Sequence, residues 1–192
     1  MKPIALCIGH SRLVKGQPEG GARSGDGVSE HQYWSIVAPM IESELADAGV
    51  PAVIVDYYEG TGYTAAMRWL AGRLRELDAA AAIELHFNSA TPRATGHEWL
   101  YWHNSRRGRS LALSLDESFS DAFDGCLMAR GAKPRTPEHR GAEFLRLTHC
   151  PAVIAEPFFG SNATDWRIAV DHRECAAESI AEGIAAWLEA GI

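Results

Sequence analysis

Short apolar runs alternate along the chain with longer segments in which apolar residues return every three or four positions. The runs at residues 4–8, 51–55, 80–85, 97–102 and 152–155 are four to six residues long and predict buried strands. The longer segments between them predict amphipathic helices, because a period near 3.6 places their apolar side chains on one face.

Four such helices are expected. The first follows Ser29, which forms a capping box with Gln32, and it ends at Gly49, a residue type favoured just after a helix. Pro39 is expected to kink or break this helix. Its predicted buried stripe consists of Tyr33, Ile36, Val37, Met40, Ile41 and Leu45. The other helices are predicted at residues 63–77, 111–123 and 175–188.

Many of the glycines and prolines lie in three segments, residues 16–27, 88–96 and 131–141, which are predicted to be loops. The first has five glycines in twelve residues. It contains neither of the glycine patterns that bind phosphate in nucleotide-binding proteins, so phosphate binding is not indicated.

Alternating strands and helices, with nearly continuous apolar strands, predict an α/β fold: a twisted, mostly parallel sheet with helices on both faces. A length of 192 residues suits a single domain, so residues 1–192 are expected to form one catalytic domain and to act as a monomer. In open sheets of this kind the active site lies at the carboxyl ends of the strands.

Charge and composition exclude several classes of function. The net charge is −7, from 25 acidic and 18 basic residues, which argues against a nucleic-acid-binding protein. No apolar run approaches the roughly 20 residues that cross a bilayer, so no stable membrane insertion is expected. The four cysteines form no C-x-x-C pair, which argues against a cysteine zinc ribbon. The N-terminal apolar run is too short for a signal peptide.

Four residues that can bind metal or transfer protons lie at element ends that meet on one edge of the predicted sheet. His10 follows the first strand, His86 the third and Glu156 the last, while Glu30 begins the first helix. Two histidines and one carboxylate are a suitable ligand set for catalytic Zn²⁺, with the fourth position left for water. A second carboxylate, Glu156, would then accept the proton of the attacking water.

The segments around these residues resemble the N-acetylmuramoyl-L-alanine amidases of the Amidase_3 type. The matching segments are Gly9-His10-Ser11, Lys15-Gly16, Gly21-Ala22, Ser29-Glu30-His31, Glu84-Leu85-His86-Phe87-Asn88-Ser89, Gly96-His97-Glu98-Trp99-Leu100-Tyr101 and Ala155-Glu156-Pro157-Phe158-Phe159, with Ser161, Asn162 and Asp165. They occur in order over most of the chain.

The resemblance implies that His10, Glu30 and His86 hold the zinc ion and that Glu156 assists the attacking water. It also implies the substrate, the amide between N-acetylmuramic acid and the L-alanine of the peptidoglycan stem peptide. One residue departs from the family, which often has a small residue where this chain has Glu84. Glu84 lies on the same strand face as His86 and either orients that histidine or competes as a ligand.

Three polar residues of the matched segments and Arg140, from a separate polar loop, are further candidates. Asn88 either fixes the loop after His86 or donates to the substrate. Arg140 is a candidate for binding a substrate carboxylate, since a guanidinium can bind one through two hydrogen bonds. Asn162 and Asp165 are expected to cap a helix and brace a loop.

Two alternatives to a peptidoglycan amidase remain. One is a zinc carboxypeptidase-like hydrolase on a similar sheet, in which Arg140 would bind the terminal carboxylate. The other is a non-catalytic wall-binding module, against which the intact Glu156 argues. The expected setting of an amidase is either a phage or prophage lysin made in the cytoplasm and acting on the cell wall, or a bacterial enzyme whose leader has been removed.

Overall fold

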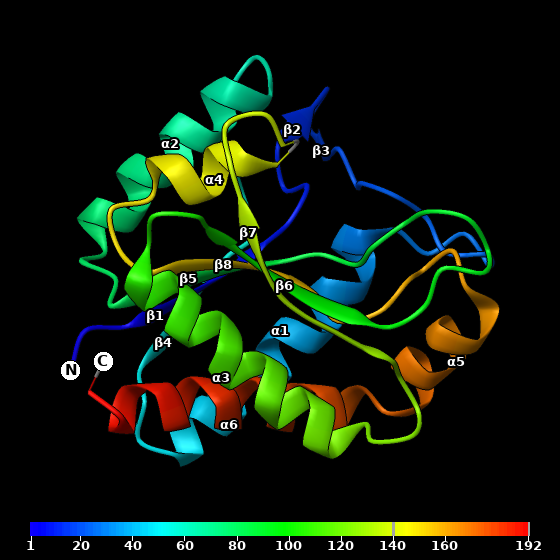
Figure 1. Cartoon of the computed structure of the whole chain (residues 1–192). Coiled ribbons are helices and arrows are strands. Elements are labelled where there is room, and N and C mark those ends of the chain that lie inside the picture. The colour runs from blue at the N-terminus through cyan, green and yellow to red at the C-terminus, as the bar shows by residue number, and fades with distance from the viewer. Residues whose placement is uncertain (140, 192) are drawn as a thin grey trace.

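A six-stranded sheet with helices on both faces forms the protein (Figure 1). The computed structural model describes residues 1–139 and 141–191. The strand order is β4 (Ala52–Val55), β1 (Ile4–Ile8), β5 (Ala81–Leu85), β8 (Ala152–Glu156), β6 (His97–Trp102) and β7 (Ala129–Arg135). The first four of these are parallel, whereas β6 pairs antiparallel with β8 and parallel with β7. The predicted α/β class and mostly parallel sheet are therefore confirmed.

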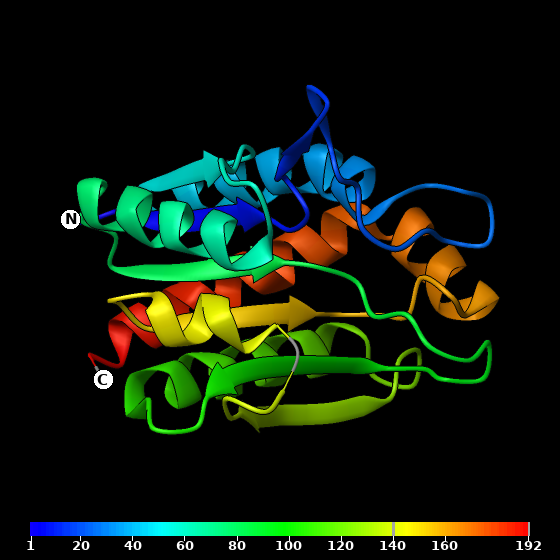
Figure 2. The ribbon, with the colours of Figure 1, turned by 90° about the horizontal axis from the view of Figure 1, so that it is seen from above.

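Helices cover both faces of the sheet, as the views in Figures 1 and 2 show. One face carries α1 (Glu30–Asp47), α3 (Arg106–Ala122) and α6 (Arg173–Glu189), and the other carries α2 (Tyr63–Glu76) and α4 (Ala142–Leu147). Each face has its own apolar core, and β1 and β5 contribute alternate side chains to both. Because alternate residues of β1 and β5 face opposite cores, these strands are apolar at nearly every position.

Helix α1 begins and ends where the sequence predicts. Ser29 accepts a hydrogen bond from the Gln32 amide, and the Gln32 side chain accepts one from the Ser29 amide. Of the kink or break predicted at Pro39, the break does not occur, because the helix runs on to Asp47. Pro39 is exposed, and the carbonyl that loses its partner belongs to Ser35, also exposed, where water can satisfy it.

The buried stripe of α1 is displaced from the predicted one. Trp34 and Ala38 are fully buried, whereas Ile36 is 52% exposed. The helix contacts α6 as well as β1 and β4, so the side of α1 that faces α6 is also covered. Apolar periodicity alone could not indicate this second contact.

Strand β7 corrects the prediction that residues 131–141 form a loop. It is an edge strand that pairs only with β6, so Pro134 needs no donor toward a second neighbour. Its charged side chains are typical of an exposed edge. A register shift between His97 and Glu98 of β6 accompanies the positive φ of Gly131.

Three further elements were not predicted. They are β2 (Leu13–Val14) and β3 (Gln17–Pro18), which form a short hairpin at the start of the glycine-rich segment 16–27, and the short helix α4. Helix α5 (Ala163–Asp171) follows Asn162, for which the sequence predicted a capping role but no helix bounds. Helix α3 also begins earlier than predicted, because Ser105 caps it by accepting from the Gly108 amide. Among the described residues, no helix has both the length and the apolar character needed to cross a membrane.

Candidate metal centre and active site

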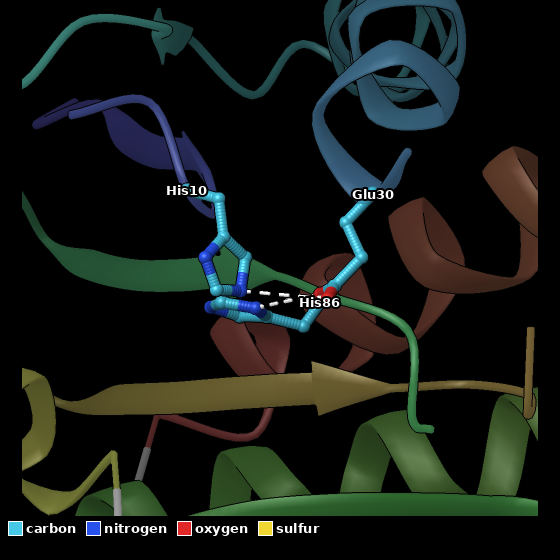
Figure 3. Close-up of side chains that lie close together, drawn as sticks. All are labelled: His10, Glu30 and His86. Carbon is cyan, nitrogen blue, oxygen red and sulfur yellow. Dashed lines mark hydrogen bonds and ion pairs between the residues drawn. The ribbon is translucent and has the colours of Figure 1, made fainter. Parts of the chain in front are cut away.

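His10, Glu30 and His86 come together at the carboxyl edge of the parallel strands. His10 lies just after β1 in a left-handed conformation with φ 59°, Glu30 is the first residue of α1, and His86 follows β5. One possible ligand atom from each lies within 4.8 Å of the others. Figure 3 shows the three side chains pointing toward one another from three separate elements. The structure therefore brings the predicted metal ligands together.

Glu30 reaches both imidazoles, whose rings also contact each other edge to face, and it is almost fully buried. Its Oε2 is 2.9 Å from His86 Nδ1, and its Oε1 is 3.4 Å from His10 Nε2. The backbone amides of Ala22 and Phe87 donate to its two oxygens. Burial by itself raises the pKa of Glu30, but His86, His10 and the Ala22 amide hold that pKa below its ordinary value. The carboxylate is therefore ionised, as a metal ligand must be.

The charge balance of the site favours a cation. Burial by itself lowers the pKa of His86, but the charge of Glu84 and the hydrogen bond and charge of Glu30 together raise that pKa well above its ordinary value. Without a metal, a proton on His86 offsets the negative charge. Two imidazole nitrogens and an ionised carboxylate form a donor set that suits Zn²⁺.

Two glycines leave the space that the ligand side chains occupy. A Cβ on Gly9 would lie 2.4 to 2.7 Å from three atoms of the His86 ring. A Cβ on Gly21 would lie 2.4 Å from His10 Cδ2 and 2.9 Å from Glu30 Oε1, and Gly21 has a φ of +76°. The backbone thus approaches both histidines more closely than any other residue type permits, which fits a preformed metal site.

Replacing Gly21 by alanine is expected to weaken zinc binding and to lower the free energy of unfolding by about 1–3 kcal/mol, because the new Cβ meets His10 and Glu30 and the left-handed backbone is strained. Zinc competition and urea unfolding measure the two effects. Gly25→Ala is the matched control, since its Cβ would meet no atom within 4 Å. Equal losses in both variants would contradict this explanation.

A cavity of about 600 Å³ opens beside the three residues and contains Glu156 at the end of β8. His10, His86 and Glu156 all line it. The Oε2 atom of Glu156 is buried and has no hydrogen-bond partner among the described residues. Burial raises the pKa of Glu156 to about 8; the charges of Glu30 and Glu98 also raise it, while those of His86 and Arg135 lower it. Below about pH 8 the carboxyl of the metal-free protein is therefore mostly protonated, and once ionised it is a stronger base than an ordinary carboxylate.

Arg135 and Glu98 belong to this site, although sequence reasoning did not identify them. Glu98 on β6 lies opposite Glu156 on β8 in the strand register. It pairs closely with Arg130 Nε at 2.6 Å and Lys133 Nζ at 2.7 Å, whereas Arg135 Nη2 is 3.7 Å away. Arg135 lines the cavity, and its buried Nε has no hydrogen-bond partner among the described residues. The Arg135 side chain as a whole is 23% exposed.

The remaining predicted residues differ in their placement. Asn162 caps α5, and Asp165 accepts from the amides of Gly96 and Phe159, so the cap and the brace are confirmed. Asn88 Oδ1 accepts from the Ser89 amide, and Asn88 is not among the residues that line the cavity. Arg140 lies outside the described residues. Substrate binding by Asn88 and Arg140 stays a prediction.

Comparison with known proteins identifies the family. Residues 4–186 match the Amidase_3 family, described as N-acetylmuramoyl-L-alanine amidase. The chain belongs to the N-acetylmuramoyl-L-alanine amidase family. It is an enzyme that hydrolyses an amide bond in peptidoglycan, and the family match argues against the peptidase and binding-module alternatives. A comparison with curated protein sequences finds no match.

Solved structures with the same fold cover nearly the whole chain. The catalytic domain of the amidase CwlV from Bacillus (Paenibacillus) polymyxa var. colistinus has a TM-score of 0.79 at 22% identity, covering 98% of this chain and 99% of that one. The amidase AmiC2 of Nostoc punctiforme has a TM-score of 0.79 at 21% identity, with 98% of both chains covered. The catalytic domain of the CD27L endolysin, which targets Clostridium difficile, has a TM-score of 0.79 at 25% identity, with 96% and 97% covered.

Proposed function

We propose that this amidase is zinc-dependent and cleaves the amide between the lactyl group of N-acetylmuramic acid and the L-alanine of the stem peptide. The observation that carries the proposal is the convergence of His10, Glu30 and His86 beside a cavity that also holds Glu156. Family membership supports the substrate. Residues 1–192 are proposed to act as one monomeric catalytic domain.

Each residue has a distinct part in this reaction. His10, His86 and Glu30 would hold the zinc ion, which would supply Lewis acidity toward a carbonyl and a water molecule. Glu156 accepts the proton of the attacking water and returns it to the leaving nitrogen. Its unpartnered buried oxygen supports this role, because no internal hydrogen bond must break first.

Substrate binding is proposed to involve Arg135 in the cavity wall. A guanidinium donates to carbonyl or carboxylate oxygens in a fixed geometry, and that of Arg135 is held only loosely by Glu98. Asn88 and Arg140 are kept as further candidates. The setting we propose is the cell wall, and the likeness to an endolysin domain agrees with action as a phage or prophage lysin.

Metal analysis tests the proposal directly. We expect about one zinc ion per chain, loss of dye release from labelled peptidoglycan on chelation, and recovery when zinc is restored. Mass spectrometry of the fragments is expected to show free L-alanine amino termini and intact muramic acid lactyl groups. Full activity in metal-free protein would refute the zinc mechanism, and cleavage within the stem peptide would refute the assigned bond.

A further inference from the structure

Each proposed zinc-binding histidine has a second carboxylate on the ring nitrogen that does not face Glu30. His86 Nε2 is 3.3 Å from Glu84 Oε2, and His10 Nδ1 is 3.4 Å from Glu19 Oε1. Both imidazoles are thus flanked by two carboxylates, of which Glu30 is shared. The two outer carboxylates differ greatly in their surroundings.

Glu84 is buried, whereas Glu19 is exposed and neutralised. The Glu84 side chain is 4% exposed and lies in the central strand β5, opposite Cys7 and Ile154 in the register. The Glu19 side chain is 37% exposed, and Arg12 binds it through Nη2 at 2.6 Å and Nε at 2.8 Å. Because charges interact more strongly away from water, Glu84 acts on its histidine with less screening than Glu19 does.

We propose that Glu84 is a positioning residue for zinc: it accepts the Nε2 proton of His86, which fixes the ring and leaves the Nδ1 lone pair for the metal. This inference rests on the proposed zinc site. A carboxylate behind a ligand histidine raises the basicity of the nitrogen that binds the metal. Gly9 also helps to fix the orientation of the His86 ring, because its backbone closely approaches three atoms of that ring.

The geometry separates this role from that of a direct ligand, an alternative that the sequence leaves open. Glu30 lies beside Nδ1 of His86, whereas Glu84 lies beside Nε2. A metal held by His86 together with Glu30 would lie on the Nδ1 side of the ring. The Glu84 carboxylate lies beside Nε2 instead and is not one of the three clustered residues, so it would act through the imidazole.

Zinc affinity of three single variants tests the proposal, measured by competition with a chromophoric chelator at fixed pH. Glu84→Gln is expected to bind zinc about 10–100-fold more weakly than the parent, because the neutral amide retains an acceptor but loses the charge. Glu19→Gln is expected to change the affinity less than about 3-fold, since Arg12 and water already screen that charge. Glu143→Gln, which removes a carboxylate from the cavity wall where Arg146 pairs with it, is the matched control and is expected to match the parent.

Two spectroscopic measurements complete the test. With Co²⁺ in place of zinc, the parent and Glu84→Gln are expected to have the same visible absorption, because the ligand set is unchanged. In the zinc-loaded parent, long-range ¹H–¹⁵N spectra are expected to place the His86 proton on Nε2, a measurement that needs no variant to fold.

Several outcomes would overturn the inference. These are equal zinc affinity of Glu84→Gln and the parent, an equal loss in Glu143→Gln, a changed cobalt spectrum, or a proton on Nδ1 of His86. Each of these leaves the zinc amidase itself intact if the parent binds zinc and cleaves peptidoglycan. A parent that binds no zinc would instead overturn the proposed function and this inference together.

Discussion

Glu156→Gln is expected to lower kcat for peptidoglycan hydrolysis by about 10²–10⁴-fold while leaving zinc content and KM close to those of the parent. The reason is that glutamine keeps the shape of the side chain but cannot accept a proton from water. Glu156 lines the cavity beside His86 without being one of the three clustered ligands, so its replacement should not release the metal. Dye release from labelled peptidoglycan and metal analysis of the same samples measure both quantities.

Glu143→Gln serves as the matched control for this prediction as well. Glu143 lines the same cavity, but it pairs with Arg146 on helix α4 and is not among the residues assigned to the chemistry. Its replacement is expected to leave kcat within about 3-fold of the parent, because this carboxylate is paired with Arg146 and has no part in the proton transfer. If Glu156→Gln released dye as fast as Glu143→Gln, the proton-transfer role of Glu156 would be wrong.

The same variant should also change how the stability of the metal-free protein depends on pH. The pKa of Glu156 is raised from 4.5 to about 8 in the folded protein, so the folded state keeps a proton that the unfolded chain releases between these values. The contribution of Glu156 to the free energy of unfolding is therefore fully present below pH 4.5. It is lost as the pH rises toward 8, by up to about 1.4 kcal/mol per pH unit. Urea unfolding in a chelator should show a smaller loss over this range in Glu156→Gln than in the parent.

The sequence predicted those parts of the fold that local chemistry determines. Helix α1 begins at Ser29 and turns at Gly49 because a side-chain cap and a left-handed glycine act within a few residues of the helix ends. The strand ends at His86 and Glu156 followed from short apolar runs. Because parallel strands end on one edge of a sheet, these strand ends could be assigned to one site although they lie far apart in the sequence.

What the sequence could not predict depends on contacts between distant segments. Strand β7 is rich in charge and includes Pro134, so its sequence favours a loop unless its position at the sheet edge is known. Arg135 lines the cavity because β7 pairs with β6, and Glu98 lies opposite Glu156 because β6 runs antiparallel to β8. The burial of Trp34, whose ring stacks on Phe158, likewise depends on a segment far away in the sequence.

Glu30→Gln is expected to have the broadest effect of all the substitutions, because Glu30 contacts both imidazoles and two backbone amides. Zinc affinity should fall by more than the 10–100-fold expected for Glu84→Gln, since a ligand itself is lost. The metal-free protein should lose about 1–3 kcal/mol of unfolding free energy. Ala22 and Phe87 donate to opposite oxygens of Glu30, and glutamine has an acceptor at only one end, so one buried amide would face an NH₂ group.

A matched control for this variant lies on the same helix. Glu44 is exposed on α1, so Glu44→Gln removes one negative charge without touching the site and is expected to keep zinc affinity and stability near those of the parent. Chelator competition and urea unfolding, done with and without zinc, separate the two consequences of Glu30→Gln. A variant that lost stability but bound zinc like the parent would show that Glu30 braces the Ala22 and Phe87 backbone without being a ligand. Loss of zinc with unchanged metal-free stability would show the reverse, because the ligand role and the bracing role act through different bonds of the same carboxylate.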